Sequence, residues 1–566
     1  MSWRLVALLA LFSLTVWPST ASADNGGTGR LGAINHVVVV YEENHSFDNL
    51  YGGWEGVNGL TSADAAHTTQ IGQGGTAYSC LLQNDVNLTS PPLVGDCTDT
   101  TTGTSFTSHF INSPFSIETF IPASAQTCPQ PGVFAQHGLL PSPANRAGGC
   151  TEDIVHRFYQ EQYQLNDGAQ NRYVTGSDAV GLSMGNYNTQ ALPIYTYLHS
   201  PAHPHYAISD NFFQSAFGGS FLNHQWLVAA ATPTYAGAPA NLNSKIDSNG
   251  MPNNYALYHA TGPVADGPLT QLCPSPVPGR ACGTSAVSYA VNTIQPAVQP
   301  TSSSPVKLPL QTGTTIGDEL SAAGVSWAWY SGGWSNADGD VGAPGWTNGT
   351  AGPNGTPGTC IDTYSSPNPA WPYCPNKVFQ FHHQPLNYYA SFAPGTPGRA
   401  HLQDEVAFDT LLGNSAKSCQ LNSVSFVKPI GLENEHPGYT SESAGSNHLV
   451  DLLQAIDGSS CRKDTMVVVT YDEFGGQWDH VSPPGQGGTA GPHDQWGPGT
   501  RIPALIVTPQ LRGNFVVDHT QYDTTSILAT IEHRYGLLPL GTRDAAVNDL
   551  GNVFNAHTPA TGGSST

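Results

Sequence analysis

The sequence predicts an α/β protein with a largely parallel central sheet. Residues 34–41 and 466–471 form continuous apolar runs rich in valine, and residues 502–508 form a third run of this kind. Such runs are typical of strands buried on both faces, as in a parallel sheet covered by helices. Helix-like patterns lie between and around them, at residues 153–164, 189–199, 316–323, 403–412, 446–456 and 524–535, and Gly536 follows the last one as a stop.

Three regions rich in Gly, Pro, Asn and Thr interrupt this alternation, near residues 57–150, 233–313 and 333–376. The ten cysteines contain no Cys-x-x-Cys motif, which in an exported chain favours disulfides over thiolate metal sites. Sequential pairing is the simplest connectivity: Cys80–Cys97, Cys128–Cys150, Cys273–Cys282, Cys360–Cys374 and Cys419–Cys461. We therefore expect one domain over residues 24–566 with disulfide-stapled loop insertions.

The first 23 residues have the pattern of a secretory signal peptide. Arg4 precedes a largely apolar stretch over residues 5–17, and Ala21-Ser22-Ala23 supplies small residues for cleavage after Ala23. No other stretch of the sequence reaches the roughly 18 apolar residues that a spanning helix needs. We expect a secreted or periplasmic protein without stable membrane insertion.

The charge balance narrows the class of partner. The chain has 41 acidic and 18 basic residues and no run of Lys or Arg, which argues against a nucleic acid or an anionic membrane surface as the main partner. An acidic protein that acts on a small anionic substrate must take positive charge from another source. Its 21 histidines and a metal ion are the two available sources.

Oxygen-bearing side chains directly follow the two longest predicted strands. Glu43 and Asn44 follow the first strand, and Asp472 and Glu473 follow the second. One such cluster alone is often only the start of a solvated loop. The carboxyl ends of parallel strands share one edge of a sheet, however, so two clusters there can converge on one hard divalent cation.

A serine after two glycines is the candidate nucleophile. The segment Phe217-Gly-Gly-Ser-Phe places Ser220 before a plausible helix, where the backbone can approach a ligand and free amides point at it. Gly-Gly-Ser on its own is usually just a turn, so a catalytic role for Ser220 requires reactive side chains close to it. Candidates are the histidines of three other segments, His156, the pair His382 and His383, and His436, although each of them alone is more often structural.

Four motifs carry a resemblance to a known family. Glu42-Glu-Asn-His-Ser-Phe-Asp48 resembles the Glu-Asn-Arg-Ser-Phe-Asp signature of the bacterial and fungal phosphoesterase family of acid phosphatases and non-haemolytic phospholipases C. Residues 470–484, 497–503 and 518–526 resemble its later signatures, and the resemblance runs from residue 34 to about 540. His45 takes the place of the commoner arginine.

The resemblance implies an alkaline-phosphatase-like three-layer sandwich with one divalent metal ion of unknown identity beside a serine nucleophile. It implies metal ligands at Glu43, Asn44, Ser220, Asp472 and Glu473, and a phosphate pocket lined by His156, His382, His383 and His436.

These observations predict an exported, metal-dependent acid phosphatase that hydrolyses phosphate monoesters through a phosphoserine. Histidines charged at mildly acidic pH would favour anionic phosphate, so we expect an acidic optimum. A phospholipase C acting on phosphatidylcholine-type lipids shares the motifs and is the first alternative. A non-catalytic extracellular binding module is the distant one, and a sulfatase is disfavoured because no Cys or Ser is followed by x-Pro-x-Arg. Physiological substrate and oligomeric state stay open.

Overall fold

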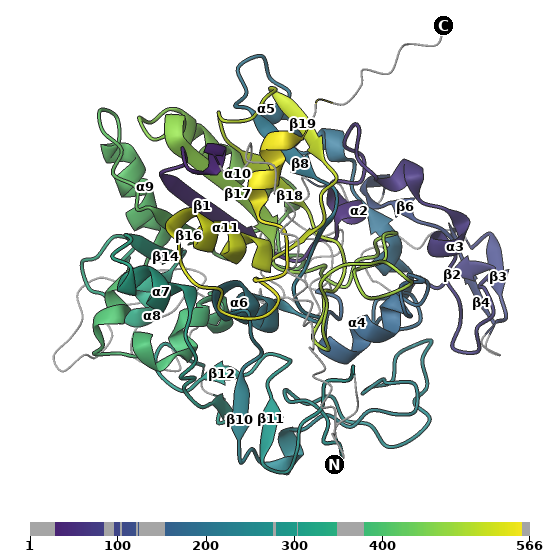
Figure 1. Cartoon of the computed structure of the whole chain (residues 1–566). Coiled ribbons are helices and arrows are strands. Elements are labelled where there is room, and N and C mark those ends of the chain that lie inside the picture. The colour runs from purple at the N-terminus through teal and green to yellow at the C-terminus, as the bar shows by residue number, and fades with distance from the viewer. Residues whose placement is uncertain are drawn as a thin grey trace, which may run out of the picture.

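The computed structural model describes residues 29–83, 95–101, 105–119, 123, 153–275, 279–302, 304–347, 379–556 and 558. The expected signal peptide and the cysteine pairs Cys128–Cys150 and Cys360–Cys374 lie outside these residues. At the centre is an eight-stranded sheet (Figure 1). Its order is β15 (Leu402–Gln403), β14 (Trp327–Ser331), β16 (Val424–Lys428), β1 (His36–Glu42), β17 (Thr465–Tyr471), β18 (Ala504–Val507), β8 (Tyr206–Ser209) and β19 (Phe515–Asp518).

The sheet is mostly parallel, as predicted. β15, β14, β16, β1 and β17 run in one direction, and β8 pairs with β19 in parallel. β18 is antiparallel to both of its neighbours, β17 and β8. The three predicted runs form β1, β17 and β18, and every residue of β17 and β18 is buried. The likeness to the alkaline phosphatase fold stays a prediction.

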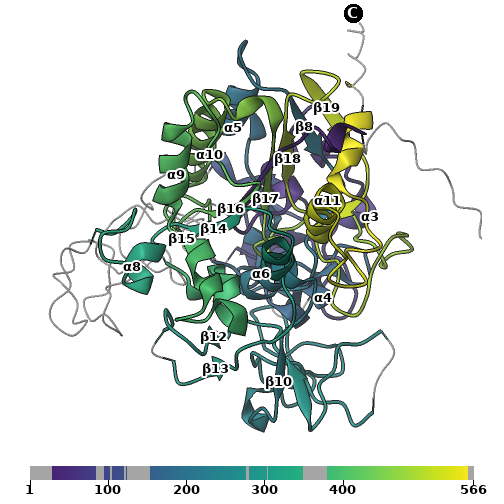
Figure 2. The ribbon, with the colours of Figure 1, turned by 60° about the vertical axis from the view of Figure 1, so that its left-hand side comes forward.

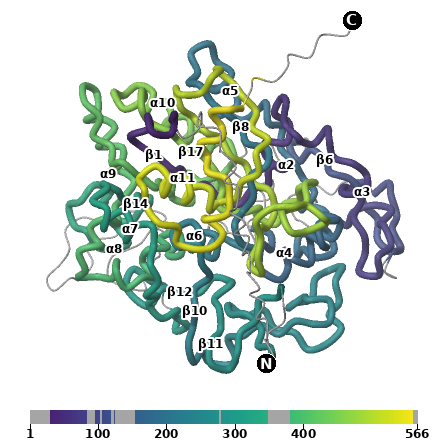
Figure 3. The backbone as a smooth tube through the Cα atoms, viewed as in Figure 1, coloured from purple at the N-terminus to yellow at the C-terminus, as the bar shows by residue number. Residues whose placement is uncertain are grey.

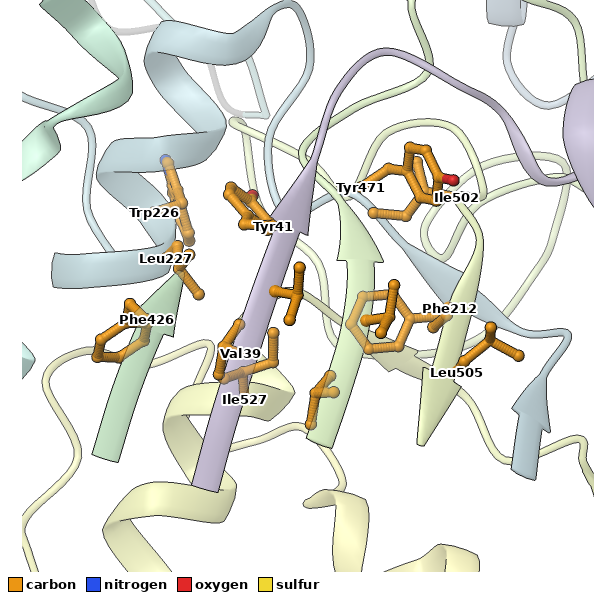
Figure 4. Packing of buried hydrophobic residues seen from close by; sticks show 14 of the residues in the cluster. Val39, Tyr41, Phe212, Trp226, Leu227, Phe426, Tyr471, Ile502, Leu505 and Ile527 are labelled. Carbon is orange, nitrogen blue, oxygen red and sulfur yellow. The ribbon is translucent and has the colours of Figure 1, made fainter. Parts of the chain in front are cut away.

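Helices cover both faces of the sheet (Figures 1 and 2). On one side lie α5 (Pro193–Leu198), α9 (Glu405–Asn414) and α10 (Glu442–Asp457), and on the other lie α6 (Ser220–Ala229), α7 (Ile316–Ala322) and α11 (Thr525–Tyr535). Figure 4 shows the core on the second side, where Trp226 and Leu227 of α6 and Ile527 of α11 pack near Val39 and Tyr41 of β1. Because these two β1 residues face α6 and α11, Glu42 faces the side of α9 and α10.

Three of the six predicted helical segments differ from the structure by several residues or are divided, and the other three differ by one or two residues. The segment at 153–164 becomes helical only in α4 (Phe158–Leu165), and Pro193 divides the segment at 189–199 into a 3-10 turn, Thr189–Ala191, and α5. α10 begins at Glu442, earlier than predicted, because the side chain of Ser441 accepts a hydrogen bond from the backbone nitrogen of Ala444. α9 and α11 shift by one or two residues.

The predicted insertion regions contain short elements where they are described. They are α3 (Ala65–Thr68), β2 (Cys80–Leu81), β3 (Cys97–Asp99), β4 (Phe106–Ser108), β5 (Phe110–Ile111), β6 (Phe115–Ser116), β10 (Thr234–Ala236), β11 (Val287–Tyr289), β12 (Gln295–Pro296), β13 (Lys307–Leu308) and α8 (Trp334–Asp338). In the tube of Figure 3, residues 233–313 gather below α4 and α6. The remaining short elements are α2 (Phe47–Leu50), β7 (Gly185–Asn186), β9 (Phe212–Phe213) and β20 (Tyr522–Asp523).

Three of the five predicted disulfides are confirmed: Cys80–Cys97, Cys273–Cys282 and Cys419–Cys461. The first two lie in insertion regions, and the third links the segments that lead into β16 and β17. Disulfides of this kind fit an extracellular protein. In the described part of the chain, no helix has the length and apolar character needed to cross a membrane.

Candidate active site

Two acidic clusters meet at the carboxyl edge of the sheet. β1 and β17 are parallel neighbours, so Glu43 and Asn44 leave the sheet beside Asp472 and Glu473. Asn44 has a left-handed backbone, with φ 64°, and its nitrogen donates to Oδ1 of Asp472 at 3.1 Å. Oδ1 of Asp472 also accepts from the nitrogen of Glu473 at 2.8 Å. The structure therefore joins the two predicted clusters, and their role as metal ligands stays a prediction.

Ser220 is the first residue of α6. The two glycines before it allow the start of this helix to pack closely against the segment that carries His156. Gly218 has φ +91°, and a Cβ there would lie 2.6 Å from the nitrogen of Phe158. A Cβ on Gly219 would lie 2.7 Å from the carbonyl oxygen of His156. Both distances are shorter than real contacts, so only glycine allows this turn to pack against the segment that carries His156.

A buried carboxylate holds the glycine turn in place. Glu161 of α4 accepts hydrogen bonds from the backbone nitrogen of Gly218, from Nε2 of Gln214 at 2.9 Å, and from both the nitrogen and Oγ1 of Thr500 at 2.8 Å. Burial raises the pKa of Glu161 to about 7, against the lowering effect of these donors. Glu161 thus ties α4 and the segment before β18 to the start of α6.

The hydroxyl of Ser220 lies among oxygens of both strand-end clusters. Its Oγ is 3.0 Å from Oε2 of Glu43, 3.4 Å from Oε1 of Glu473 and 3.5 Å from Oδ1 of Asn44. The residue is 4% exposed. The hydroxyl of Ser220 therefore lies within about one hydrogen-bond length of oxygen atoms from residues that follow two parallel strands.

The predicted histidines surround this serine. Nε2 of His156 and Nε2 of His436 lie 3.4 Å and 3.2 Å from Nδ2 of Asn44. Nε2 of His383 lies 3.1 Å from Oε1 of Glu43, and the ring of His382 packs edge-on against that of His383 with 4.5 Å between centroids. His382 and His383 lie in a 3-10 turn, Phe381–His383.

Two of these imidazole rings turn an unprotonated nitrogen towards the site. Nδ1 of His156 lies 2.6 Å from the carbonyl oxygen of Ile154, and Nδ1 of His436 lies 2.7 Å from that of Pro437. A carbonyl oxygen only accepts, so each Nδ1 carries the proton and each neutral ring turns an unprotonated Nε2 to Asn44.

The histidines are not charged in mildly acidic solution, contrary to the sequence-based expectation. Burial lowers the pKa of His156 to about 4 and that of His382 to about 3. Burial also lowers the pKa of His383 and His436 well below the usual range. Removal from water penalises the charged imidazolium, an effect that the sequence alone does not display.

Two residues near the serine were not predicted from the sequence. Lys428, the last residue of β16, places Nζ 2.6 Å from Oε1 of Glu43. His224 lies one helical turn after Ser220, and its Nδ1 is 2.8 Å from the carbonyl oxygen of Ser220. The ring of His224 stacks on that of His383 at 4.9 Å. The spacing of four residues from Ser220 was the available signal for His224, since such residues share one helix face.

The acidic groups suit a divalent cation. Ligand atoms of Glu43, His224 and Asp472 lie within 4.8 Å of one another. Oδ2 of Asp472 is buried and receives no hydrogen bond from any described residue. Burial, followed by the charge of Glu43, raises the pKa of Asp472, and burial followed by the charge of Asp472 raises that of Glu473. Lys428 alone cannot neutralise three carboxylates, and a bound cation would do so.

A cavity of about 420 Å³ opens beside Ser220. Its walls combine histidines of the site with acidic and aromatic side chains, and the residues lining it are Asp153, Ile154, Val155, His156, Arg157, Asp178, Gly219, Ser220, Phe221, Asn292, Thr293, His382, His436 and Tyr439. Burial, followed by the charges of Asp178 and Glu43, raises the pKa of Asp153. The cavity is large enough for a small organic phosphate.

A second buried network holds the loops that carry the acidic clusters. Arg501, just before β18, donates from Nε to both carboxylate oxygens of Asp479 at 3.1 and 3.2 Å, and from Nη2 to Oδ1 of Asp48 at 3.1 Å. Nδ1 of His480 lies 2.5 Å from Oδ2 of Asp48. Asp48 follows Asn44 in the chain, and Asp479 follows Glu473. Arg501 therefore joins the loop after β1 to the loop after β17.

Comparison with known proteins places the chain in a class of hydrolases. The Phosphoesterase family matches residues 34–538, which is most of the chain. Enzymes of this class hydrolyse phosphoric esters. The chain belongs to the Phosphoesterase family.

The relatives it matches include named phospholipases. Phospholipase C B of Mycobacterium tuberculosis is 35% identical over 164 residues, 25% of this chain and 30% of the relative. Non-hemolytic phospholipase C of Burkholderia pseudomallei is 28% identical over 280 residues, 44% of this chain and 36% of the relative. The matched segments thus span about a third of the length of these relatives.

A solved structure is also similar at a low level. The structure of BT4656 in complex with its substrate D-glucosamine-2-N,6-O-disulfate is 11% identical and covers 65% of this chain and 76% of that chain. The TM-score of 0.22 is too low to support any argument about this chain.

Proposed function

We propose that the chain is an exported acid phosphatase that hydrolyses phosphate monoesters through a phosphoserine at Ser220. The observation that carries the proposal is the position of the Ser220 hydroxyl, 3.0 Å from Glu43 and 3.4 Å from Glu473, beside a cavity of about 420 Å³. With it we propose an alkaline-phosphatase-like sandwich, a single catalytic domain over residues 24–566, cleavage after Ala23, and a secreted or periplasmic location.

The side chains of the site support a two-step reaction. The Oγ of Ser220 attacks phosphorus while Oε2 of Glu43, which already accepts its hydrogen bond, takes the serine proton. The ester bond to the alcohol breaks, and an imidazole that has taken a proton at Nε2, His156 or His436, protonates the departing oxygen. Water then attacks the phosphoserine, and the Ser220–phosphorus bond breaks to release phosphate.

Glu43, Asn44, Ser220, Asp472 and Glu473 would hold one divalent ion, with His224 beside them. When bound, such an ion lowers the pKa of a serine hydroxyl and neutralises charge on the phosphoryl oxygens. We assign hydrogen-bond donation to phosphate oxygens to His382, which lines the cavity, and to His383, whose ring packs against that of His382.

Phospholipase C activity is the second candidate, and the names of the relatives favour it. To separate the two, wild-type protein is assayed on p-nitrophenyl phosphate and on phosphatidylcholine vesicles, with and without EDTA. We expect release of p-nitrophenol that EDTA abolishes and added divalent metal restores. Release of choline phosphate without monoester turnover would favour the phospholipase, and no turnover on either substrate would contradict both.

Activity on p-nitrophenyl phosphate should fall as the pH rises. The reaction needs a protonated imidazole, and burial lowers the pKa of His156 to about 4, so the protonated fraction grows only towards low pH. A phosphate ester also loses its second charge below a pH of about 6, which suits a pocket rich in carboxylates. We expect kcat/KM to peak below about pH 6 and to drop roughly tenfold or more by pH 8.5. A profile flat from acid to strongly alkaline pH would refute this prediction.

A further inference from the structure

A second group of acidic residues lies on the opposite side of the sheet from Ser220. Glu42 ends β1 and is fully buried, and neither of its carboxylate oxygens has a hydrogen-bond partner among the described residues. Side chains alternate along a strand. Tyr41 packs on His224 of α6, so Glu42 faces the side where α9 and α10 lie (Figure 2).

Three side chains from separate elements converge on that side. Glu405 begins α9, His448 lies in α10, and Glu433 follows β16. Their ligand atoms lie within 4.8 Å of one another, with Nε2 of His448 3.1 Å from Oε1 of Glu405 and 3.8 Å from Oε2 of Glu433. The Glu433 side chain is 50% exposed, so one side of the group opens to solvent.

The geometry within this group is not that of a hydrogen-bonded pair. Glu405 is 5% exposed, and its Oε1 points at His448 yet receives no hydrogen bond from any described residue. Nδ1 of His448 is also buried and has no hydrogen-bond partner in the described chain. A buried carboxylate without hydrogen bonds is costly unless another group satisfies it. Close approach of these atoms without a hydrogen bond is the arrangement expected of side chains that face one shared cation.

The surrounding charges also favour a cation. Among the described residues, the ion pairs of Glu405 and Glu433 are both with His448. Burial lowers the pKa of His448 to about 4, so it is neutral near pH 7 and supplies no positive charge. Burial raises the pKa of Glu405, and the charge of Glu433 raises it further. In the part of the chain that the structure describes, neither carboxylate forms an ion pair with a Lys or Arg side chain.

We propose that Glu405, Glu433 and His448 form a second divalent cation site, separate from the Ser220 site. Two carboxylates and one imidazole are a donor set for ions such as Mn²⁺ or Zn²⁺, and water on the open side of Glu433 completes the coordination. The ion would join α9, α10 and the loop after β16, and would balance the charge of Glu42. The site stands apart from the proposed phosphatase function, because none of its residues lines the cavity beside Ser220.

The test is metal binding by the full chain. Wild type, His448→Ala, Glu433→Gln, Asp472→Asn and the control Asp96→Asn are stripped of metal and titrated with MnCl₂ and, separately, ZnCl₂. Asp96 is an acidic residue whose side chain is 61% exposed, in the first insertion region and outside both sites. Stoichiometry is measured by equilibrium dialysis, and thermal unfolding is followed in parallel.

We expect His448→Ala and Glu433→Gln each to bind one ion fewer than Asp96→Asn, or to bind that ion about 100-fold more weakly. They should also lose the metal-dependent rise in melting temperature. Asp472→Asn should keep that ion, so a failure of the Ser220 site is recognised separately. Unchanged binding of both metals in His448→Ala and Glu433→Gln would overturn the proposal, and Glu433→Gln guards against a folding defect because this side chain is half exposed.

Discussion

Ser220→Ala should abolish phosphate ester hydrolysis while the protein stays folded. The Oγ of Ser220 forms its hydrogen bonds with polar side chains of the site, among them Glu43, Glu473 and Asn44, so its removal deletes the proposed nucleophile and leaves the Cβ in place. Loss of a nucleophilic serine costs at least about 1,000-fold in kcat in enzymes of this type. We expect a fall of that size on p-nitrophenyl phosphate, or on phosphatidylcholine if that is the substrate turned over by wild type.

The measurement combines steady-state kinetics with mass spectrometry after acid quench. Wild type should show a phosphate added to the peptide that contains Ser220, and the variant should not. Ser391→Ala, a change at an exposed serine, serves as the matched control and should keep full activity. Activity of Ser220→Ala within tenfold of wild type would rule out Ser220 as the nucleophile, whatever the fold.

Arg501→Met should be the most destabilising single change outside the serine site. Arg501 is fully buried and bridges Asp48 and Asp479, which are also buried. Removing one partner of a buried ion pair leaves an uncompensated charge and costs about 3–5 kcal/mol. Because Arg501 joins the two loops that carry the acidic clusters, metal affinity at the Ser220 site should fall as well.

The pH dependence distinguishes lost charge from lost packing. Burial raises the pKa of Asp479, and Arg501 opposes this rise. Without Arg501 the pKa of Asp479 rises further, so the variant regains part of its stability as the pH falls and Asp479 is protonated. We expect the difference in free energy of unfolding between variant and wild type to shrink from pH 7 to pH 4, measured with urea. Arg512→Met, at an exposed position, should show no such difference; a constant difference for Arg501→Met would point to packing instead.

The strands that could be predicted are those whose burial on both faces produces a continuous apolar run in the sequence. The valine-rich runs predicted β1 and β17 nearly to the residue, since each strand has an unbroken run of buried apolar residues in its middle. The direction of β18 could not be predicted, because a strand buried on both faces has the same composition in either orientation. The late start of α4 was missed because residues 153–157 line the cavity in extended form, although their pattern suits a helix.

The residues of the site could be predicted from the sequence better than their charged neighbours and protonation states. Glu43, Asn44, Asp472 and Glu473 stand at strand ends, a position that sequence periodicity can locate. Lys428 was missed because its neighbour Glu43 is distant in sequence and only the register of β16 beside β1 brings them together. The neutral state of the histidines was also missed, because the pKa of a side chain depends on its burial, which no local motif reveals.

The central position of β1 has a consequence for synthesis of the chain. Val37 of β1 pairs with Val424 on one side and Met466 on the other, so the first strand made must wait about 390 residues for a neighbour. At roughly 5–20 residues per second, the apolar strand stays unpaired on the ribosome for about 20 to 80 seconds. The sheet can therefore be completed only when the last quarter of the chain is made, and until then β1 is an apolar strand exposed to aggregation.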